Sequence, residues 1–342
     1  MGVSRSARPA VLLAVLLLLV TGCVSTGDGG GGDGSRAKVR IALDWTPNSN
    51  HLGLYAAQQQ RWYEEAGLDV EILPYNNASA DTLVAQGTAD FGISFQDTFT
   101  FARASGADIT SVMAIVQHWT TMIAVRADRK DIVTPRDLDG TVYGGFGAPY
   151  EEPKMRAVIK DAGGKGDFTT VVLGTSVYEA LYAGKVDFTE PFATWEVIEA
   201  ELRGKPLKTF AYTDHGFPDA YNVLLVGNSS WLRKNRDTAT AFVRATQRGY
   251  ELAAKDPDRA GELLEKANPG AFSSKELIRR SGRLLARYLR DEKGAVGTQT
   301  LAKWRGYSGF LYDSGVLTGP DGAKVTKRPD FSRWFTNEYL AR

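Results

Sequence analysis

Apolar runs typical of strands alternate with segments of helical spacing from residue 38 onward. Residues 39–43 read as a short buried strand, and a helix is predicted from 52 to 66, where Gly67 ends it. Further strands are predicted at 69–73 and 90–93, and further helices at 79–86 and 97–104. Strands separated by helices predict right-handed βαβ units and a parallel sheet.

The same alternation restarts near residue 141. The predicted strands are 141–144, 170–173, 187–189 and 207–212, and the predicted helices are 151–161, 177–183 and 192–202. The remainder is mostly helical, with helical spacing at 236–254, 258–266 and 275–288.

Two apolar, β-rich segments, 121–125 and 221–226, separate these blocks. We interpret them as two strands that cross between lobes. Lobe one would then comprise 38–125 and 222–342, with lobe two, 126–221, inserted in it. The predicted fold class is α/β, with two α/β lobes joined by two crossing strands. We expect a ligand cleft at the carboxyl ends of both sheets, and a hinge that closes it.

The N-terminal segment predicts the compartment. Arg5 and Arg8 precede an unbroken apolar run at 10–20, which is too short to span a bilayer, and the only cysteine, Cys23, follows it. This pattern is typical of a bacterial lipoprotein signal peptide at 1–22, with the lipid on Cys23; the alternative is a buried structural cysteine. The Gly/Ser/Asp-rich stretch 23–37 predicts a flexible tether. We therefore expect an extracytoplasmic protein anchored by lipid to the cell membrane.

Composition narrows the function. The 342 residues include 41 basic and 40 acidic side chains, a balance that argues against nucleic-acid binding. One cysteine and three dispersed histidines exclude a disulfide within the chain and argue against a zinc site. The Gly-x-Ser-x-Gly, Walker A and His-Glu-x-x-His motifs are absent. We expect binding without catalysis, metal or cofactor.

Two places carry candidate binding chemistry. Trp45 lies in the turn after the first strand, where its ring could stack on a planar ligand. Phe192 and Glu196 are four residues apart, on one face of a predicted helix, and suit an aminoheterocycle: the ring stacks while the carboxylate accepts from N–H donors. The alternatives are that Trp45 packs onto its lobe, that His51 is an ordinary helix-start histidine, and that Glu196 is solvated.

The glycine-rich segment 144–147 follows a predicted strand and precedes a predicted helix. Such a turn resembles a phosphate cradle, in which backbone N–H groups would hold a polar edge of the ligand. The alternative is that the glycines serve only the geometry of the turn.

Three motifs carry a family resemblance: Asp-Trp-Thr-Pro-Asn-Ser-Asn-His at 44–51, Gly-Leu-Tyr-Ala-Ala at 53–57 and Glu-Ala-Gly-Leu-Asp-Val at 65–70. They resemble the thiamine-pyrimidine-precursor family, which joins formylaminopyrimidine-binding proteins of ABC importers with hydroxymethylpyrimidine phosphate synthases. Gly-Ile-Ser-Phe-Gln at 92–96 and the 144–147 segment extend the resemblance, which covers about residues 38–255.

The resemblance implies the type II periplasmic-binding-protein fold. In the importer branch two aromatics stack on the pyrimidine and a glutamate pairs with it; the matching positions are Trp45, Phe192 and Glu196. That branch often has Tyr at the position of Phe192. The other residues expected at the ligand are Asn48, His51, Gln96, Phe146, Gly147, Tyr150, Trp195 and Tyr221.

Departures from the synthase branch favour the importer branch. The synthase forms an aldimine through a lysine and uses a histidine four residues later, and the corresponding residues here are Ser94 and Thr98. The synthase's cysteine cluster is also missing near 217–221. The predicted function is capture of an aminopyrimidine precursor of thiamine, such as the N-formyl compound, by a monomer that docks on permease and ATPase subunits. The alternatives are an importer protein for riboflavin, a sulfonate or nitrate, and an extracytoplasmic pyrimidine-metabolising enzyme.

Overall fold

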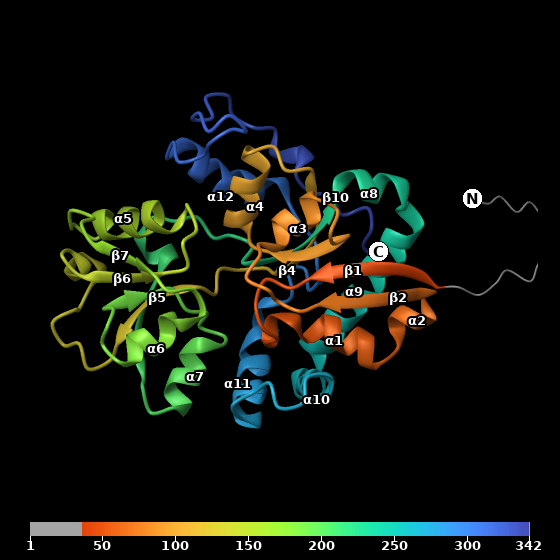
Figure 1. Cartoon of the computed structure of the whole chain (residues 1–342), viewed down its shortest axis with the longest axis horizontal. Helices are drawn as coiled ribbons and strands as arrows, with labels where there is room; N and C mark the ends of the chain where they lie inside the picture. Colours follow the sequence, from red (N-terminus) through yellow and green to blue (C-terminus); the bar gives the residue numbers. More distant parts are fainter. Residues whose placement is uncertain (1–35, 342) are drawn as a thin grey trace, which may run out of the picture. The chain divides into compact units, whose positions relative to one another are not determined.

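Residues 36–341, which the computed structural model describes, contain two separate five-stranded sheets (Figure 1). The first sheet has the order β2-β1-β3-β10-β4 and the second β7-β6-β8-β5-β9. The strands of the first sheet are β1 Ala37–Ala42, β2 Leu68–Leu73, β3 Phe91–Ser94, β4 Ile109–Val116 and β10 Val223–Asn228. Those of the second are β5 Met122–Arg126, β6 Val142–Gly145, β7 Thr169–Val172, β8 Phe188–Thr189 and β9 Leu207–Ala211. The predicted signal peptide, most of the tether and Cys23 lie outside the described residues.

Both sheets are mixed, not parallel as predicted. In the first sheet β1 pairs parallel with β2 and β3, but β10 is antiparallel to β3 and β4. In the second, β6 pairs parallel with β7 and β8, but β5 is antiparallel to β8 and β9. The reason is the route of the chain: β5 and β10 each enter their sheet from the other lobe, at the carboxyl ends of the parallel strands, so they run in the opposite direction.

The two crossing segments differ from the prediction in which sheet they join. The sequence pattern predicts 121–125 as a crossing strand of lobe one, whereas β5 lies within the second sheet and β10 within the first. The chain crosses instead in the connections 117–121 and 212–222. An apolar, β-rich segment predicts a strand, but tertiary packing determines which strands it pairs with.

Helices cover both sheets. Those that follow strands of the first sheet are α1 Leu52–Gln59, α2 Trp62–Glu65, α3 Ala80–Ala85, α4 Gln96–Ala104, α8 Ser229–Lys234, α9 Arg236–Lys255, α10 Pro257–Ala267 and α11 Lys275–Leu285. Those of the second lobe are α5 Glu151–Asp161, α6 Val177–Tyr182 and α7 Glu196–Leu202. The predicted helix 52–66 is two helices, because Arg61 between them has a left-handed φ of 62°.

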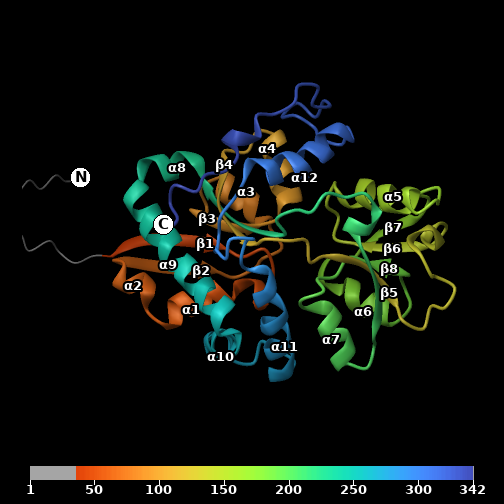
Figure 2. The same cartoon turned by 180° about the vertical axis from the view of Figure 1, so that it is seen from behind.

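The first sheet is buried on both faces. Along β10, Val223 and Leu225 join the core formed with α1, α9, α10 and α11, while Leu224 and Val226 join the core on the opposite face. This alternation is that of a central strand. Figures 1 and 2 show α3 and α4 across the sheet from α1, α10 and α11.

The C-terminal helix α12 Leu301–Asp313 was not predicted, and it does not belong to lobe one alone. Its Tyr307 and Leu311 pack in the core of the second lobe with Ile123 and Val125 of β5. The Ser308 hydroxyl lies 2.8 Å from that of Thr100 on α4. Helix α12 therefore contacts both lobes beside the crossing segments.

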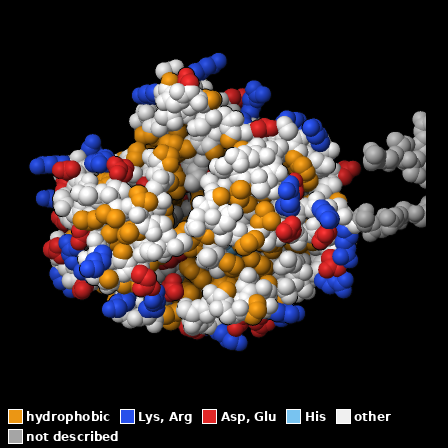
Figure 3. Space-filling model, viewed as in Figure 1, with side chains coloured by type: hydrophobic (Ala, Val, Ile, Leu, Met, Phe, Trp, Pro, Cys, Tyr) orange, Lys and Arg blue, Asp and Glu red, His pale blue; other side chains and the backbone are white. Residues whose placement is uncertain are grey.

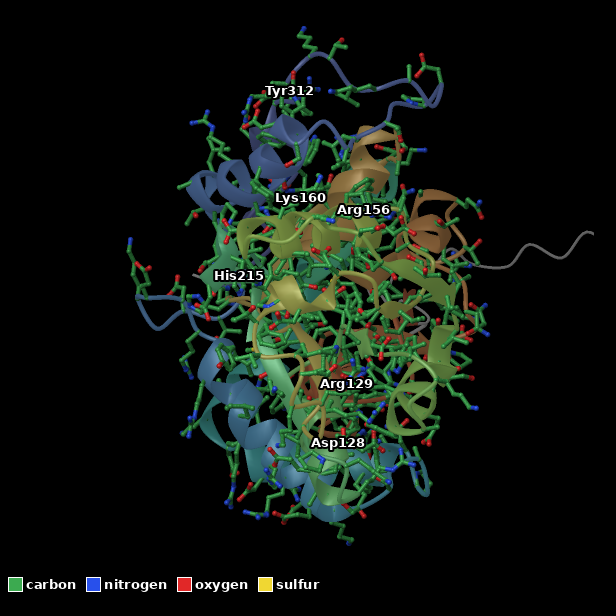
Figure 4. The ribbon with its side chains drawn as sticks, turned by 90° about the vertical axis from the view of Figure 1, so that its left-hand side faces the viewer. Asp128, Arg129, Arg156, Lys160, His215 and Tyr312 are labelled. Atoms are coloured by element: carbon green, nitrogen blue, oxygen red, sulfur yellow. The ribbon has the colours of Figure 1, made fainter. Side chains whose placement is uncertain are left out.

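The outer face of the second lobe carries charged side chains (Figure 4). Arg129 pairs with Asp131 at 2.7 Å and with Asp187, and the guanidinium of Arg156 lies 4.6 Å from the centre of the Phe168 ring. Within residues 36–341, no helix has the length and apolar character needed to cross a bilayer.

Two glycines bring α1 and α9 close enough to position the turn after β1. A side chain at Gly53 would strike the ring of Tyr250, and one at Gly249 would strike the carbonyl of Gly53. The close approach lets the Tyr250 hydroxyl donate to the Asn50 carbonyl at 2.7 Å. The contact between these helices thereby supports residues 44–51.

We expect Gly249→Ala to lower the free energy of unfolding by about 1–3 kcal/mol, because the added methyl group overpacks the α1–α9 contact. Urea unfolding measures the effect. The matched control is Gly306→Ala in α12, where a Cβ would only touch Pro218 at 3.8 Å and alanine favours the helix. Equal losses in the two variants would contradict the packing argument.

Candidate ligand-binding site

A cavity of about 280 Å³ lies at the carboxyl ends of the parallel strands and is lined by both lobes. Trp45 follows β1, Phe95 follows β3, Phe146 follows β6, and Glu190 follows β8. Thr121 and Asn222, which immediately precede β5 and β10, line it as well. Figure 3 shows a hollow between the lobes with hydrophobic side chains at its edge. This is the position expected for a ligand in open α/β sheets.

The turn after β1 is held by His51, which is fully buried and does not line the cavity. Its Nδ1 accepts from the backbone N–H of Asn48 at 3.2 Å, so its Nε2–H donates to Asp44 at 2.8 Å. The Asn48 side chain accepts from the N–H of Asn50 at 2.8 Å and caps the 3₁₀ helix η1 Ser49–His51. His51 was expected at the ligand, but it instead orients Asp44, which lines the cavity.

Trp45 lies in an aromatic contact between the lobes. Its ring centre is 5.2 Å from that of Tyr75 and 5.9 Å from that of Phe146, the latter in an edge-to-face arrangement. Phe146 in turn lies 6.2 Å from Tyr178. Trp45 therefore lines the cavity and does not simply pack onto its own lobe.

Glu196 begins α7 and is buried, with 5% of its surface exposed. Its Oε2 accepts from the backbone N–H of Phe192 at 2.9 Å, which places both residues at the cavity although Phe192 precedes the helix. Burial raises the pKa of Glu196 to about 7, and the Phe192 N–H offsets part of that rise. Glu196 is thus not on a solvated face. Trp195 also lines the cavity and packs on Phe272 of the first lobe, with ring centres 6.0 Å apart.

Two N–H groups of the glycine-rich turn are bonded within the protein. The Glu151 carboxylate accepts from the N–H of Phe146 at 2.9 Å and from that of Ala148 at 2.7 Å. A side chain at Gly145 would strike Glu151, and Gly147 has a φ of 91°. The glycines therefore serve the geometry of the turn, which directs the Phe146 ring to the cavity, and Gly147 is not a lining residue.

Gln96 and Tyr221, both predicted at the ligand, also lie outside the lining. The Gln96 side chain accepts from the backbone N–H of Tyr221 at 2.9 Å, and its amide nitrogen lies 3.3 Å from the Ser308 hydroxyl. The Tyr221 hydroxyl accepts from the N–H of Thr300 at 2.8 Å. Together these bonds attach the second crossing segment to α4 and to the C-terminal region.

A buried ion cluster lies at the cavity, and no sequence motif predicts it. Lys154 of α5 has 3% of its surface exposed and bonds Glu190 of its own lobe and Asp97 of α4, the latter at 3.3 Å. The ring of Tyr150, a predicted residue that lines the cavity, lies 4.9 Å from its Nζ. Trp119 and Tyr212 lie at 5.3 and 5.0 Å. Burial lowers the pKa of Lys154, but the two carboxylates outweigh it and raise the pKa overall.

The cavity wall is acidic. The described lining residues include no lysine, arginine or histidine. Five carboxylates line the cavity: Asp44, Asp81, Asp97, Glu190 and Glu196. Burial raises the pKa of Asp81 and of Glu190 to about 7. Of these five, the sequence pattern predicts only Glu196 at the ligand. In the described part of the chain, no group of His, Cys, Asp and Glu could hold a metal ion.

A family model described as NMT1/THI5 like matches residues 48–260, more than half of the chain. The chain belongs to the NMT1/THI5-like family. This NMT1/THI5-like protein is 28% identical over 302 residues to a formylaminopyrimidine-binding protein of Halalkalibacterium halodurans, a match that covers 86% of this chain and 89% of that one.

Other relatives of this NMT1/THI5-like protein are enzymes. The 4-amino-5-hydroxymethyl-2-methylpyrimidine phosphate synthase THI13 of Saccharomyces cerevisiae is 25% identical over 238 residues, which cover 66% of this chain and 70% of the synthase. The family therefore joins binding proteins with synthases.

Solved structures give the fold of this NMT1/THI5-like protein. The aliphatic sulphonate-binding protein SsuA of Escherichia coli matches with a TM-score of 0.62 at 16% identity, over 88% of this chain and 92% of SsuA. A Candida albicans protein with the generic periplasmic-binding-protein fold matches with a TM-score of 0.61 at 14% identity, over 88% and 96%. The predicted type II periplasmic-binding-protein fold is confirmed.

The raised pKa values predict how the ligand-free protein responds to pH. Asp81, Glu190 and Glu196 titrate near pH 7 in the folded state but near 4 in the unfolded chain. Between pH 5 and 7 the folded state holds protons that the unfolded state has released, so the free energy of unfolding falls as pH rises. We expect lower stability at pH 8 than at pH 5.

Between pH 5 and pH 8 the free energy of unfolding should fall by about 1–3 kcal/mol less in Glu196→Gln than in the unaltered protein, because one of the three carboxyl groups no longer titrates. Urea unfolding at pH 5, 6, 7 and 8 measures it. Glu71→Gln, at an exposed position on β2, is the control and should leave the slope unchanged. A Glu196→Gln curve parallel to that of the unaltered protein would contradict this assignment.

Proposed function

We propose that the protein is the solute-binding component of an ABC importer and captures a 4-aminopyrimidine precursor of thiamine, the N-formyl aminomethyl compound or one like it. The observation that carries the proposal is the buried Glu196 carboxylate in a cavity with aromatic walls, to which Trp45 and Phe192 contribute. An aminopyrimidine needs aromatic cover for its ring faces and an acceptor for its amino edge, and this cavity offers both. The formylaminopyrimidine-binding relative supports the same ligand class.

The charge of the cavity argues against the anionic alternatives. Binding a sulfonate or nitrate in a buried site requires compensating positive charge or free N–H donors. The described lining has five carboxylates and no basic side chain, and Glu151 accepts from two N–H groups of the turn at 144–148, those of Phe146 and Ala148. The likeness to SsuA therefore extends to the fold and not to its ligand.

A binding function is also favoured over catalysis. The position that matches the synthase's aldimine-forming lysine is Ser94, whose hydroxyl donates to Asp81 at 2.9 Å, and the position of its histidine is Thr98. The two hydroxyls lie 3.1 Å apart. Neither residue can form an aldimine, and Lys154 is engaged by two carboxylates. We infer that the ligand leaves the protein unchanged.

The importer role places the protein outside the cytoplasm. Closed lobes would dock, as a monomer, on permease subunits that an ATPase drives. The apolar run 10–20 followed by Cys23 supports a cleaved signal peptide and a lipid anchor, with the Gly-rich stretch as the tether.

We expect N-formyl-4-amino-5-aminomethyl-2-methylpyrimidine to bind at a ratio of one to one in calorimetry. Glu196→Gln should weaken binding by about 1.5–3 kcal/mol, because it removes the charge from a buried acceptor. Trp45→Ala should cost at least as much, through lost ring contact and buried area. Glu71→Gln, at an exposed position on β2, is the control and should leave the affinity unchanged. If both cavity variants bind as tightly as the unaltered protein, these residues do not form the site.

We expect the chain expressed in a bacterium to carry lipid on Cys23 and to fractionate with membranes, while Cys23→Ser is unlipidated and soluble after release. The measurement is mass spectrometry of the N-terminal peptide together with detergent partitioning. Ser25→Ala, two residues along the chain, is the control and should keep the lipid. Unaltered protein without lipid would contradict the anchor.

A further inference from the structure

The cavity has a second buried acceptor besides Glu196. Asp81, the second residue of α3, lines the cavity on the first lobe with 4% of its surface exposed. One carboxylate oxygen, Oδ2, accepts from the Ser94 hydroxyl, whereas Oδ1 has no hydrogen-bond partner among the described residues. A buried carboxylate oxygen without a donor is costly, so this group favours a ligand that supplies one.

A second unpartnered acceptor lines the same cavity. Asn50 has 2% of its surface exposed, and its side-chain Oδ1 likewise has no partner in residues 36–341. The Asn50 backbone is held on both sides, since its N–H donates to Asn48 and its carbonyl accepts from Tyr250. These bonds fix the backbone that carries the acceptor.

The charges around Asp81 favour a cation as its partner. Burial raises the pKa of Asp81 most and nearby hydroxyls lower it, while the charges of Asp97 and Asp44 raise it further, so both carboxylates lie within electrostatic reach of Asp81. Lys154 is bonded to Asp97 and to Glu190. Asp44 also acts on Glu196, across the cavity on the second lobe. No cationic side chain among the described lining residues balances Asp44 and Asp81.

We propose that Asp81 binds an ammonium group on the ligand, with Asn50 as a further acceptor in the same cavity, so that the protein prefers the free 5-aminomethyl pyrimidine, a cation, to its N-formyl derivative. The inference rests on the proposed function and deepens it: Glu196 takes the amino edge of the ring, and Asp81 takes the substituent. A formamide brings one N–H and no charge, whereas an ammonium brings three donors and the positive charge that this wall lacks.

The test is calorimetry with three 4-amino-2-methylpyrimidines that differ only at position 5: aminomethyl, formamidomethyl and hydroxymethyl. The unaltered protein should bind the aminomethyl compound about tenfold or more tightly than either of the others. Asp81→Asn keeps the shape of the side chain and one acceptor. Its affinity should fall about tenfold or more for the aminomethyl compound and less than about threefold for the other two. Asp69→Asn, at an exposed position on β2, changes the net charge equally and should bind all three as the unaltered protein does.

A second measurement uses only the unaltered protein, so it holds even if Asp81→Asn folds poorly. Asp81 has a pKa of about 7 without ligand, and a bound ammonium lowers that pKa. Binding of the aminomethyl compound at pH 7 should therefore release more protons than binding of the formamide, measured from the enthalpy in buffers of different ionisation enthalpy.

Two results would overturn the inference: a formamide that binds more tightly than the amine, or equal proton release by both compounds. Either leaves the proposed function intact, because a pyrimidine still binds. If none of the three pyrimidines binds, the proposed function itself fails. The two failures are therefore distinguishable.

Discussion

The arrangement of the two lobes at the cavity depends on the ion pairs that the buried Lys154 ammonium forms with two carboxylates. One of its carboxylate partners, Glu190, belongs to the second lobe, and the other, Asp97, to the first. In a buried cluster, loss of one partner leaves an uncompensated charge, which is strongly destabilising. Lys154 is fully paired only while the lobes are together, and the aromatic rings around it exclude water from the cluster. Trp45 and Phe146 add an apolar contact between the same lobes.

Pairing of Lys154 has a consequence for the rest of the cavity. Its charge is divided between two carboxylates, and among the described lining residues no basic side chain accompanies Asp44, Asp81 and Glu196. Burial raises the pKa of Asp81 and of Glu196, because their charged forms lose hydration in the folded state. A ligand rich in N–H donors would relieve that cost. In the proposed function, the stability of the empty protein and its choice of ligand depend on the same carboxylates.

Local sequence predicted some site residues because their position depends on near neighbours. Trp45 follows a strand, and Glu196 is tied to Phe192 by a bond across four residues. His51, Gln96 and Tyr221 were predicted at the ligand because they lie close along the chain to such positions. Each faces away into a hydrogen bond with the protein, with Asp44, Ser308 and Thr300 respectively. Proximity in sequence does not decide which way a side chain points, because neighbouring residues in a turn can direct their side chains to opposite sides.

The sequence by itself determined the alternation of strands and helices, the two-lobed α/β fold and the family motifs, because periodicity and turn residues act over a few positions. Tertiary structure alone decided that β5 and β10 run against their neighbours, that α12 contacts both lobes, and that Glu151 accepts from two N–H groups of the glycine-rich turn. It also brought Asp97, Lys154 and Glu190 together from separate segments. Strand direction, burial and charge pairing are set by residues far apart in the chain, and only packing brings those residues into contact.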